Sequence, residues 1–289
     1  MSANREHKNS VFTTLFDNTD NLLSLYNAVS GSDLPADTPI KIATLKNVLF
    51  NDLRNDIAFV LGDKLVILVE HQSTINENMP LRMLIYLTRV YEKLIDKKAI
   101  YKRKLLRIPK PDFIVLYNGT DPFPDEKMLY LSDAYKEYPE KAEGLGGSLD
   151  LSVRVLNINI GRNDEIVMKS ESLYGYVRFI GKIRNNLQTG IDLAGAITKA
   201  VSDCLKEGIL SDFLKTHATE VINMLTTKWN DEQARKVWEE EAREEGLDLS
   251  AEIVRALLKN ESIEDIAARF HVSIDKVKQL QSVLIQPSA

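Results

Sequence analysis

The chain has 289 residues, of which 44% are hydrophobic and 27% charged, and its formal net charge at pH 7 is -5. This apolar content excludes a largely disordered chain, and the acidic balance weighs against a protein that only coats nucleic acid. The single cysteine, Cys204, excludes an internal disulfide, and the lack of Cys-x-x-Cys pairs or clustered His and Cys excludes a structural zinc. No stretch approaches ~20 consecutive apolar residues, and the polar start lacks a secretory signal. We therefore expect a cytoplasmic protein without membrane contacts.

Helical spacing of apolar side chains predicts a first helix over residues 9–30, capped by Ser10. A loop rich in Gly, Pro and Asp follows at residues 31–39. Apolar side chains at helical spacing predict a second helix from Pro80 to about residue 96. Apolar or alternating runs predict strands at residues 42–50, 56–61, 65–70, 112–117 and 149–160.

Only helices are expected after residue 170, so the chain divides into an α/β part and a helical part. We expect a domain over residues 1–190, a helical extension over residues 191–248, and a small helical tail over residues 249–289. The end of the extension, residues 231–248, holds eight acidic against three basic residues, which is typical of a solvated helix.

The tail carries the sequence pattern of two short helices joined by a turn. Ser262 and Ser273 stand at the two predicted N-cap positions. The pattern fits a helix-turn-helix that contacts DNA through its second helix. It also fits a packed helical hairpin through which the chain forms a homodimer.

The segment from Asn55 to Thr74 contains the candidate chemistry. Two buried apolar runs are joined by a turn at Gly62-Asp63, and the acids Asp56 and Glu70 stand at their outer ends. Two carboxylates at a buried strand end are costly unless something pairs with them, and a divalent cation is a suitable partner. Such an ion also serves phosphoryl transfer, because it activates water and neutralises charge on the phosphate. Asp56 could instead be a turn residue at the start of its strand.

Gln72 lies two residues after Glu70, so in a strand the two side chains share a face. The Gln72 amide would then lie beside the metal site and orient the attacking water. His71 points the other way and would offer its backbone carbonyl as a further metal ligand.

The same residues carry a resemblance to a known family. The motif comprises Asn55-Asp56, Glu70-His71-Gln72-Ser73-Thr74, Asn78-Met79-Pro80-Leu81-Arg82 and Tyr86. It resembles the Rpn family of recombination-promoting nucleases and transposase-like proteins, part of the PD-(D/E)XK nuclease superfamily. The resemblance covers residues 9 to about 160.

The resemblance implies a restriction-endonuclease-like core, a mixed sheet flanked by helices, followed here by a helical C-terminal extension. It implies hydrolysis of DNA phosphodiester bonds with Mg²⁺ or Mn²⁺, in recombination, mobile elements or defence against phage. Asp56, Glu70 and Gln72 would be catalytic, and Asp56, Glu70 and the His71 carbonyl would hold the metal. Gln72 departs from the lysine usual in the superfamily. This departure and the acidic balance keep one alternative open, a non-catalytic DNA-binding protein on a degenerate nuclease fold. A ribonuclease using the same site is a third possibility.

Basic side chains that follow the motif are candidates for binding the substrate. They are Arg82, Lys97, Lys98, Lys102, Arg103 and Lys104. The alternative for Arg82 is a structural role at the sheet, and for the others a solvated charged surface.

One ion can bridge Asp56 and Glu70 only if both side chains project from the same side of the sheet. A two-residue turn at Gly62-Asp63 would place Asp56 opposite Val69. A regular hairpin of this kind, with the two carboxylates on opposite faces, would forbid the shared ion and contradict the nuclease assignment. We therefore expect a three-residue loop, a bulge, or a sharp bend at Asp56. The two carboxylates should then lie within roughly 4–6 Å of each other.

Overall fold

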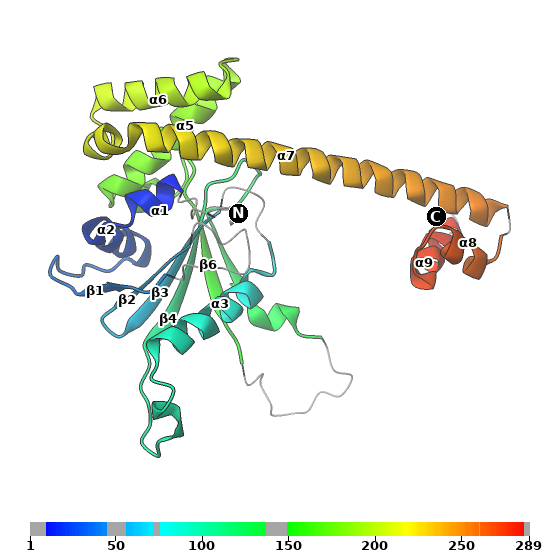
Figure 1. Ribbon diagram of the computed structural model, residues 1–289, viewed down its shortest axis with the longest axis horizontal. Coiled ribbons are helices and arrows are strands. Elements are labelled where there is room, and N and C mark those ends of the chain that lie inside the picture. The colour runs from blue at the N-terminus through cyan, green and yellow to red at the C-terminus, as the bar shows by residue number, and fades with distance from the viewer. Residues whose placement is uncertain (1–9, 45–55, 72–75, 137–148, 260, 286–289) are drawn as a thin grey trace, which may run out of the picture. The chain divides into compact units, whose positions relative to one another are not determined.

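The structure is a computed structural model that describes residues 10–44, 56–71, 76–136, 149–259 and 261–285. Its centre is a mixed sheet of six strands in the order β1-β2-β3-β4-β6-β5 (Figure 1). The strands are β1 (Ile40–Ile42), β2 (Asp56–Leu61), β3 (Lys64–His71), β4 (Lys110–Tyr117), β5 (Glu126–Tyr130) and β6 (Ser152–Asn157). β3, β4 and β6 run parallel to one another, and the remaining neighbours pair antiparallel. The expected α/β class is confirmed.

The central strands form because their sequences are apolar on both sides. Leu65, Val66 and Ile67 of β3 are fully buried, and β4 is buried from Phe113 to Tyr117. Continuous apolar runs are typical of parallel strands covered on both faces. β5 was not predicted, because Leu129 is its one buried residue and the strand lies at the edge of the sheet.

The two faces of the sheet pack against different helices. The face that carries Ala58, Ile67 and Val115 packs against α3 (Met79–Leu94), and we call it the α3 face. The other face meets α2 (Thr19–Ser30), where the rings of Tyr26 and Phe59 lie 6.3 Å apart edge to face. We call it the α2 face.

The predicted helix over residues 9–30 is two helices, α1 (Val11–Leu15) and α2. The expected cap is confirmed, because the Ser10 hydroxyl accepts a hydrogen bond from the Thr13 amide. The interruption lies at Asn18, whose side-chain oxygen accepts hydrogen bonds from the amides of Asp20 and Asn21 and so starts a new helix. This local capping competes with continuation of the first helix.

The remainder of the described chain is helical after residue 163. These helices are α4 (Asp164–Val167), α5 (Glu171–Gln188), α6 (Leu193–Glu207), α7 (Ser211–Leu258), α8 (Ile263–Arg269) and α9 (Ile274–Ile285). In the part of the chain that the structure describes, none of the helices has the length and apolar character needed to cross a bilayer.

The chain divides into two compact units, Met1–Thr226 and Thr227–Ala289. The first unit includes α6, whose side chains Ile197, Ala200 and Cys204 are buried. The boundary falls within α7, which is one continuous helix.

The second unit has a small apolar core of its own. Ile253 of α7, Ile266 of α8 and Val277 of α9 are its most buried members. Both predicted N-caps are confirmed: Ser262 accepts a hydrogen bond from the Asp265 amide, and Ser273 accepts one from the Lys276 amide.

Candidate active site

The sheet brings the two acidic positions to the same end of its strands, which we call the carboxyl edge or simply this edge. Asp56 is the first residue of β2, Glu70 is the seventh residue of β3, and the pairing with β4 aligns Glu70 with Leu116. This is the edge at which the parallel strands β3, β4 and β6 end. Open α/β sheets bind ligands at the carboxyl ends of their parallel strands.

The predicted three-residue loop is wrong. Leu61 pairs with Lys64, so the turn contains only Gly62 and Asp63, and the pairing stays regular back to Asp56 opposite Val69. Gly62 adopts a φ of +57°, which glycine permits without strain and which suits a tight hairpin. The described part of the β2–β3 ladder contains no bulge, so of the three expected irregularities only a bend at Asp56 remains. Such a bend would involve Asn55, which lies outside the described residues.

Regular pairing assigns the two positions to different faces. Residues directly opposite each other share a face, so position 56 belongs with Val69 on the α3 face. Position 70 is aligned with Leu116 and belongs to the α2 face. The regular hairpin therefore does not fit one ion shared by both acids.

Three features of the predicted site lie outside what the structure describes. They are the side chains of Asp56 and Glu70 with their predicted separation, and Gln72 as a whole. Among the side chains that are described, no group of three or more His, Cys, Asp or Glu gathers as a metal-binding set.

Arg82 lies in α3 and is only 9% exposed. A phosphate contact requires an accessible guanidinium. This burial favours the structural role over the substrate contact.

The candidate lysines and Arg103 lie at the opposite end of the strands. Lys97, Lys98, Lys102, Arg103 and Lys104 are exposed in the segment between α3 and β4. That segment leads into Lys110, which pairs with Lys64 beside the hairpin turn. β4 has eight residues and at ~3.3 Å per residue spans roughly 23 Å. The structure therefore does not bring these cations together with Glu70.

A polar cluster that the sequence did not reveal occupies the edge near Glu70. Asn118 directly follows β4 and is 2% exposed. Arg184 of α5 donates hydrogen bonds to the side-chain oxygens of Asn118, at 3.1 Å, and Asn159, at 2.8 Å, and to the Asn118 carbonyl. The buried Asn118 amide nitrogen has no hydrogen-bond partner among the described residues. A cation and a free amide donor thus lie where the parallel strands end.

Asn157 and Tyr117 complete the surroundings of this cluster. The Asn157 side-chain oxygen accepts hydrogen bonds from the backbone and side-chain nitrogens of Asn159, while its amide donates to the Phe123 carbonyl. The Tyr117 hydroxyl donates to the Asp121 carbonyl at 2.8 Å, and burial raises the pKa of this phenol. Burial therefore favours the protonated form of Tyr117, whose hydroxyl is held by the Asp121 carbonyl.

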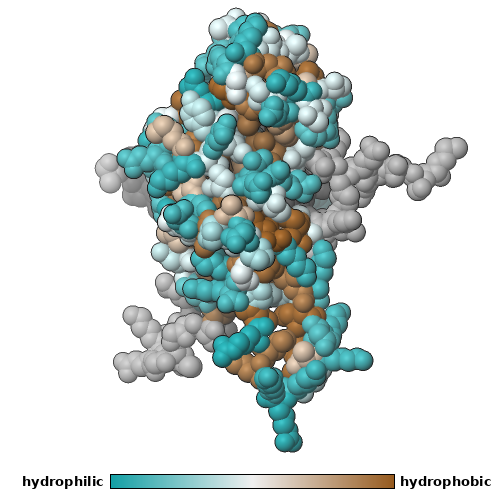
Figure 2. All heavy atoms as spheres, turned by 90° about the vertical axis from the view of Figure 1, so that its left-hand side faces the viewer, coloured by the Kyte–Doolittle hydropathy of each residue, from teal (hydrophilic) through white to brown (hydrophobic). Residues whose placement is uncertain are grey.

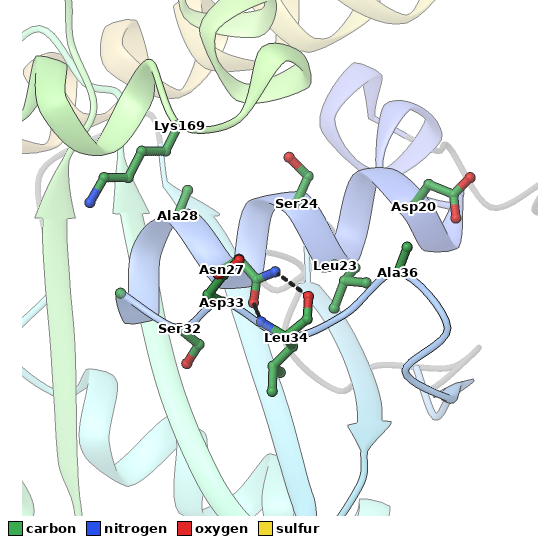
Figure 3. A pocket seen from close by; sticks show the side chains of 11 residues that line it. Asp20, Leu23, Ser24, Asn27, Ala28, Ser32, Asp33, Leu34, Ala36 and Lys169 are labelled. Atoms are coloured by element: carbon green, nitrogen blue, oxygen red, sulfur yellow. Dashed lines mark hydrogen bonds between the residues drawn. The ribbon is translucent and has the colours of Figure 1, made fainter.

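A separate open cavity of about 580 Å³ lies beside α2 (Figure 3). Its walls are α2, the loop after it and Lys169, and Asn27 closes the loop by hydrogen bonds with both backbone groups of Leu34. None of its described lining residues comes from β2, β3 or β4, so it is distinct from the predicted site.

Comparison of the chain with protein-family models, curated proteins and solved structures found no match in any of the three. The Rpn assignment therefore rests on the resemblance of the sequence motif.

Proposed function

We propose that the chain is a divalent-cation-dependent deoxyribonuclease that hydrolyses phosphodiester bonds, with Asp56, Glu70 and Gln72 as catalytic residues. The observation that supports it is the convergence of the start of β2 and the end of β3 at the sheet edge where Arg184 also lies. The long motif from Glu70 to Arg82 gives this edge its proposed chemistry. The setting would be recombination, mobile elements or phage defence.

The regular hairpin sets a structural condition on this proposal. The register assigns position 56 to the α3 face and position 70 to the α2 face, so this proposal requires the chain to bend at Asp56 for the two carboxylates to meet. A Mg²⁺ or Mn²⁺ ion, held by both acids and the His71 carbonyl, would supply charge neutralisation at the phosphate.

A second function is favoured by the same register. If Asp56 keeps its place opposite Val69, the chain is a non-catalytic DNA-binding protein on a nuclease-like fold. Gln72 in place of a lysine also favours this function. A ribonuclease would differ from the proposed enzyme in substrate alone.

The test is nicking of supercoiled plasmid by the full chain with Mg²⁺ or Mn²⁺, and with the ions chelated. Asp56→Ala and Glu70→Ala should each abolish nicking while the thermal unfolding midpoint changes little. Asp63→Ala is the matched control, because it removes an exposed carboxylate from the turn of the same hairpin and should leave nicking unchanged.

Nicking by Asp56→Ala at the wild-type rate would refute the assignment of that residue. Binding of DNA by the wild-type chain without cleavage under any of these ions would favour the non-catalytic function. Cleavage of RNA but not of plasmid would identify the ribonuclease.

A further inference from the structure

Residues 95–109 link α3 to β4 and form a segment that we call the basic arm. It carries six cations, Lys97, Lys98, Lys102, Arg103, Lys104 and Arg107. All six side chains are exposed, and the one acid in the arm is Asp96. The arm is therefore a strongly positive surface on a chain whose formal net charge is -5.

Large apolar side chains are interspersed with these cations. Tyr101 is 90% exposed, Leu105 77% and Ile100 61%, and Leu106 and Ile108 are also exposed. Figure 2 shows this mixture at the lower end of the molecule, where brown apolar atoms lie among long teal side chains. Several large apolar side chains gathered in one exposed segment mark an interaction site.

Both ends of the arm are fixed to the fold. At its end, the Tyr91 hydroxyl donates a hydrogen bond to the Pro109 carbonyl, and the Lys110 amide donates to the Asp63 carbonyl. At its start, the Ile95 amide donates a hydrogen bond to the Tyr91 carbonyl of α3. Within the arm, the Lys98 amide donates to the Asp96 carboxylate, and Ala99–Tyr101 form a 3-10 turn. The exposed side chains are thus presented from an anchored loop.

The charge of the arm selects the kind of partner. Six cations against one acid would make the arms of two copies of this chain repel each other. An irregular backbone is also poorly suited to the hydrocarbon of a bilayer, because its polar groups would lack hydrogen-bond partners there. A nucleic acid offers phosphates to the cations, and its bases can stack on an aromatic ring or admit an aliphatic side chain between them.

We propose that the basic arm is a nucleic-acid-binding surface remote from the edge that carries Glu70. This proposal extends the proposed function and rests on it in one respect, the identification of the bound nucleic acid as DNA. β4 separates the arm from that edge by roughly 23 Å, which at 3.4 Å per base pair corresponds to about seven base pairs of duplex. The arm binds DNA away from the scissile bond and contributes to affinity.

The test measures binding of the full chain to a fluorescent 30-base-pair duplex by anisotropy, with chelator present so that cleavage does not interfere. The variant Lys102→Gln/Arg103→Gln/Lys104→Gln removes three arm cations. The control Lys41→Gln/Lys206→Gln/Lys215→Gln removes the same charge from exposed lysines outside the arm.

The arm variant should bind at least about tenfold more weakly than the control at low salt. Its plot of log affinity against log salt should be shallower by about 2.7, since each lost phosphate contact removes about 0.9 from the slope. Tyr101→Ala should weaken binding without changing this slope, because it removes a contact that carries no charge.

Equal affinity and slope for the arm variant and the control overturn the proposal, whether or not the chain cleaves DNA. Binding of anionic phospholipid vesicles through the arm, without binding of duplex, also overturns it and identifies a membrane surface. If the arm behaves as expected but plasmid nicking fails, the nuclease function is wrong while the arm proposal stands.

Discussion

Asp56 stands opposite Val69 in the β2–β3 ladder, and the regular alternation of the strand assigns Glu70 to the other face of the sheet. The regular register therefore places positions 56 and 70 at the same end of the strands but on opposite faces of the sheet. Any chemistry that uses them jointly requires the start of β2 to leave the regular pairing. This gives the candidate active site a condition that can be tested in solution.

A double-mutant cycle on Asp56 and Glu70 distinguishes joint from independent action. If both carboxylates hold one ion, Asp56→Asn/Glu70→Gln should nick plasmid no more slowly than the slower single variant, because removing either acid already disables the unit. Steady nicking rates at saturating Mg²⁺ give the four values of the cycle. Losses that simply multiply would contradict a shared ion and would fit the regular register.

Gln72 is the position that departs from the usual superfamily lysine. Gln72→Ala should slow nicking by about 10- to 100-fold, because the attacking water loses the amide that orients it. Gln72→Lys should retain or raise the rate, since an ammonium supplies positive charge beside the phosphate. Single-turnover cleavage checks both variants, and an unchanged rate in Gln72→Ala would remove the amide from the mechanism.

The pair of Glu126 and Arg154 predicts an acid-dependent stability. Two hydrogen bonds from the Arg154 guanidinium, at 2.9 and 2.8 Å, hold the pKa of Glu126 below its usual value of 4.5. A carboxyl whose pKa is lower in the folded than in the unfolded state stabilises the fold at pH values above its unfolded-state pKa. This stabilisation is lost as the pH falls through the folded-state pKa. Glu126→Gln should therefore lower the free energy of unfolding at pH 7, by less than about 1 kcal/mol for a partly exposed pair, and have less effect at pH 3. Urea unfolding at both pH values measures this, and in an Arg154→Met background the pH dependence of the effect should disappear.

Arg184 should be a major contributor to the stability of the sheet edge. Arg184→Met leaves two oxygens of Asn118 and one of Asn159 without this donor, and we expect a loss of about 2–4 kcal/mol in the free energy of unfolding. Arg162→Met is the control, because Arg162 forms an exposed ion pair with Asp125 and should change stability by less than about 0.5 kcal/mol. Equal effects of the two substitutions on denaturant unfolding would show that the cluster is not structural.

The α/β class could be predicted because the central strands have a clear sequence signal. Burial on both faces gives β3 and β4 continuous apolar runs, and their predicted positions agree with the structure. β5 gave no such signal, with Leu129 as its one buried side chain. The break between α1 and α2 was also not predicted. The apolar pattern is continuous there, and the break depends on the Asn18 side chain, which caps the start of α2.

The candidate site was less accessible to prediction, for two physical reasons. A turn of two residues and a turn of three residues give different strand registers, and the apolar periodicity of the sequence does not distinguish them. Gly62 allows the shorter turn, which the structure adopts. Arg184 reaches Asn118 across 66 positions of sequence, so no local pattern joins them. The distance of the basic arm from Glu70 likewise follows from strand direction, which the sequence leaves open until the parallel pairing of β3 with β4 is known.

The single cysteine offers a route to selective labelling. Cys204 is fully buried in α6, and burial raises the pKa of its thiol to about 11. The thiolate is the reactive form, so at pH 7.5 only on the order of one Cys204 thiol in a few thousand is nucleophilic. A cysteine introduced at an exposed position such as Tyr101 will therefore react with a maleimide dye far faster than Cys204 does. A Tyr101→Cys variant can therefore carry a single fluorophore or cross-linker on its arm while Cys204 is kept.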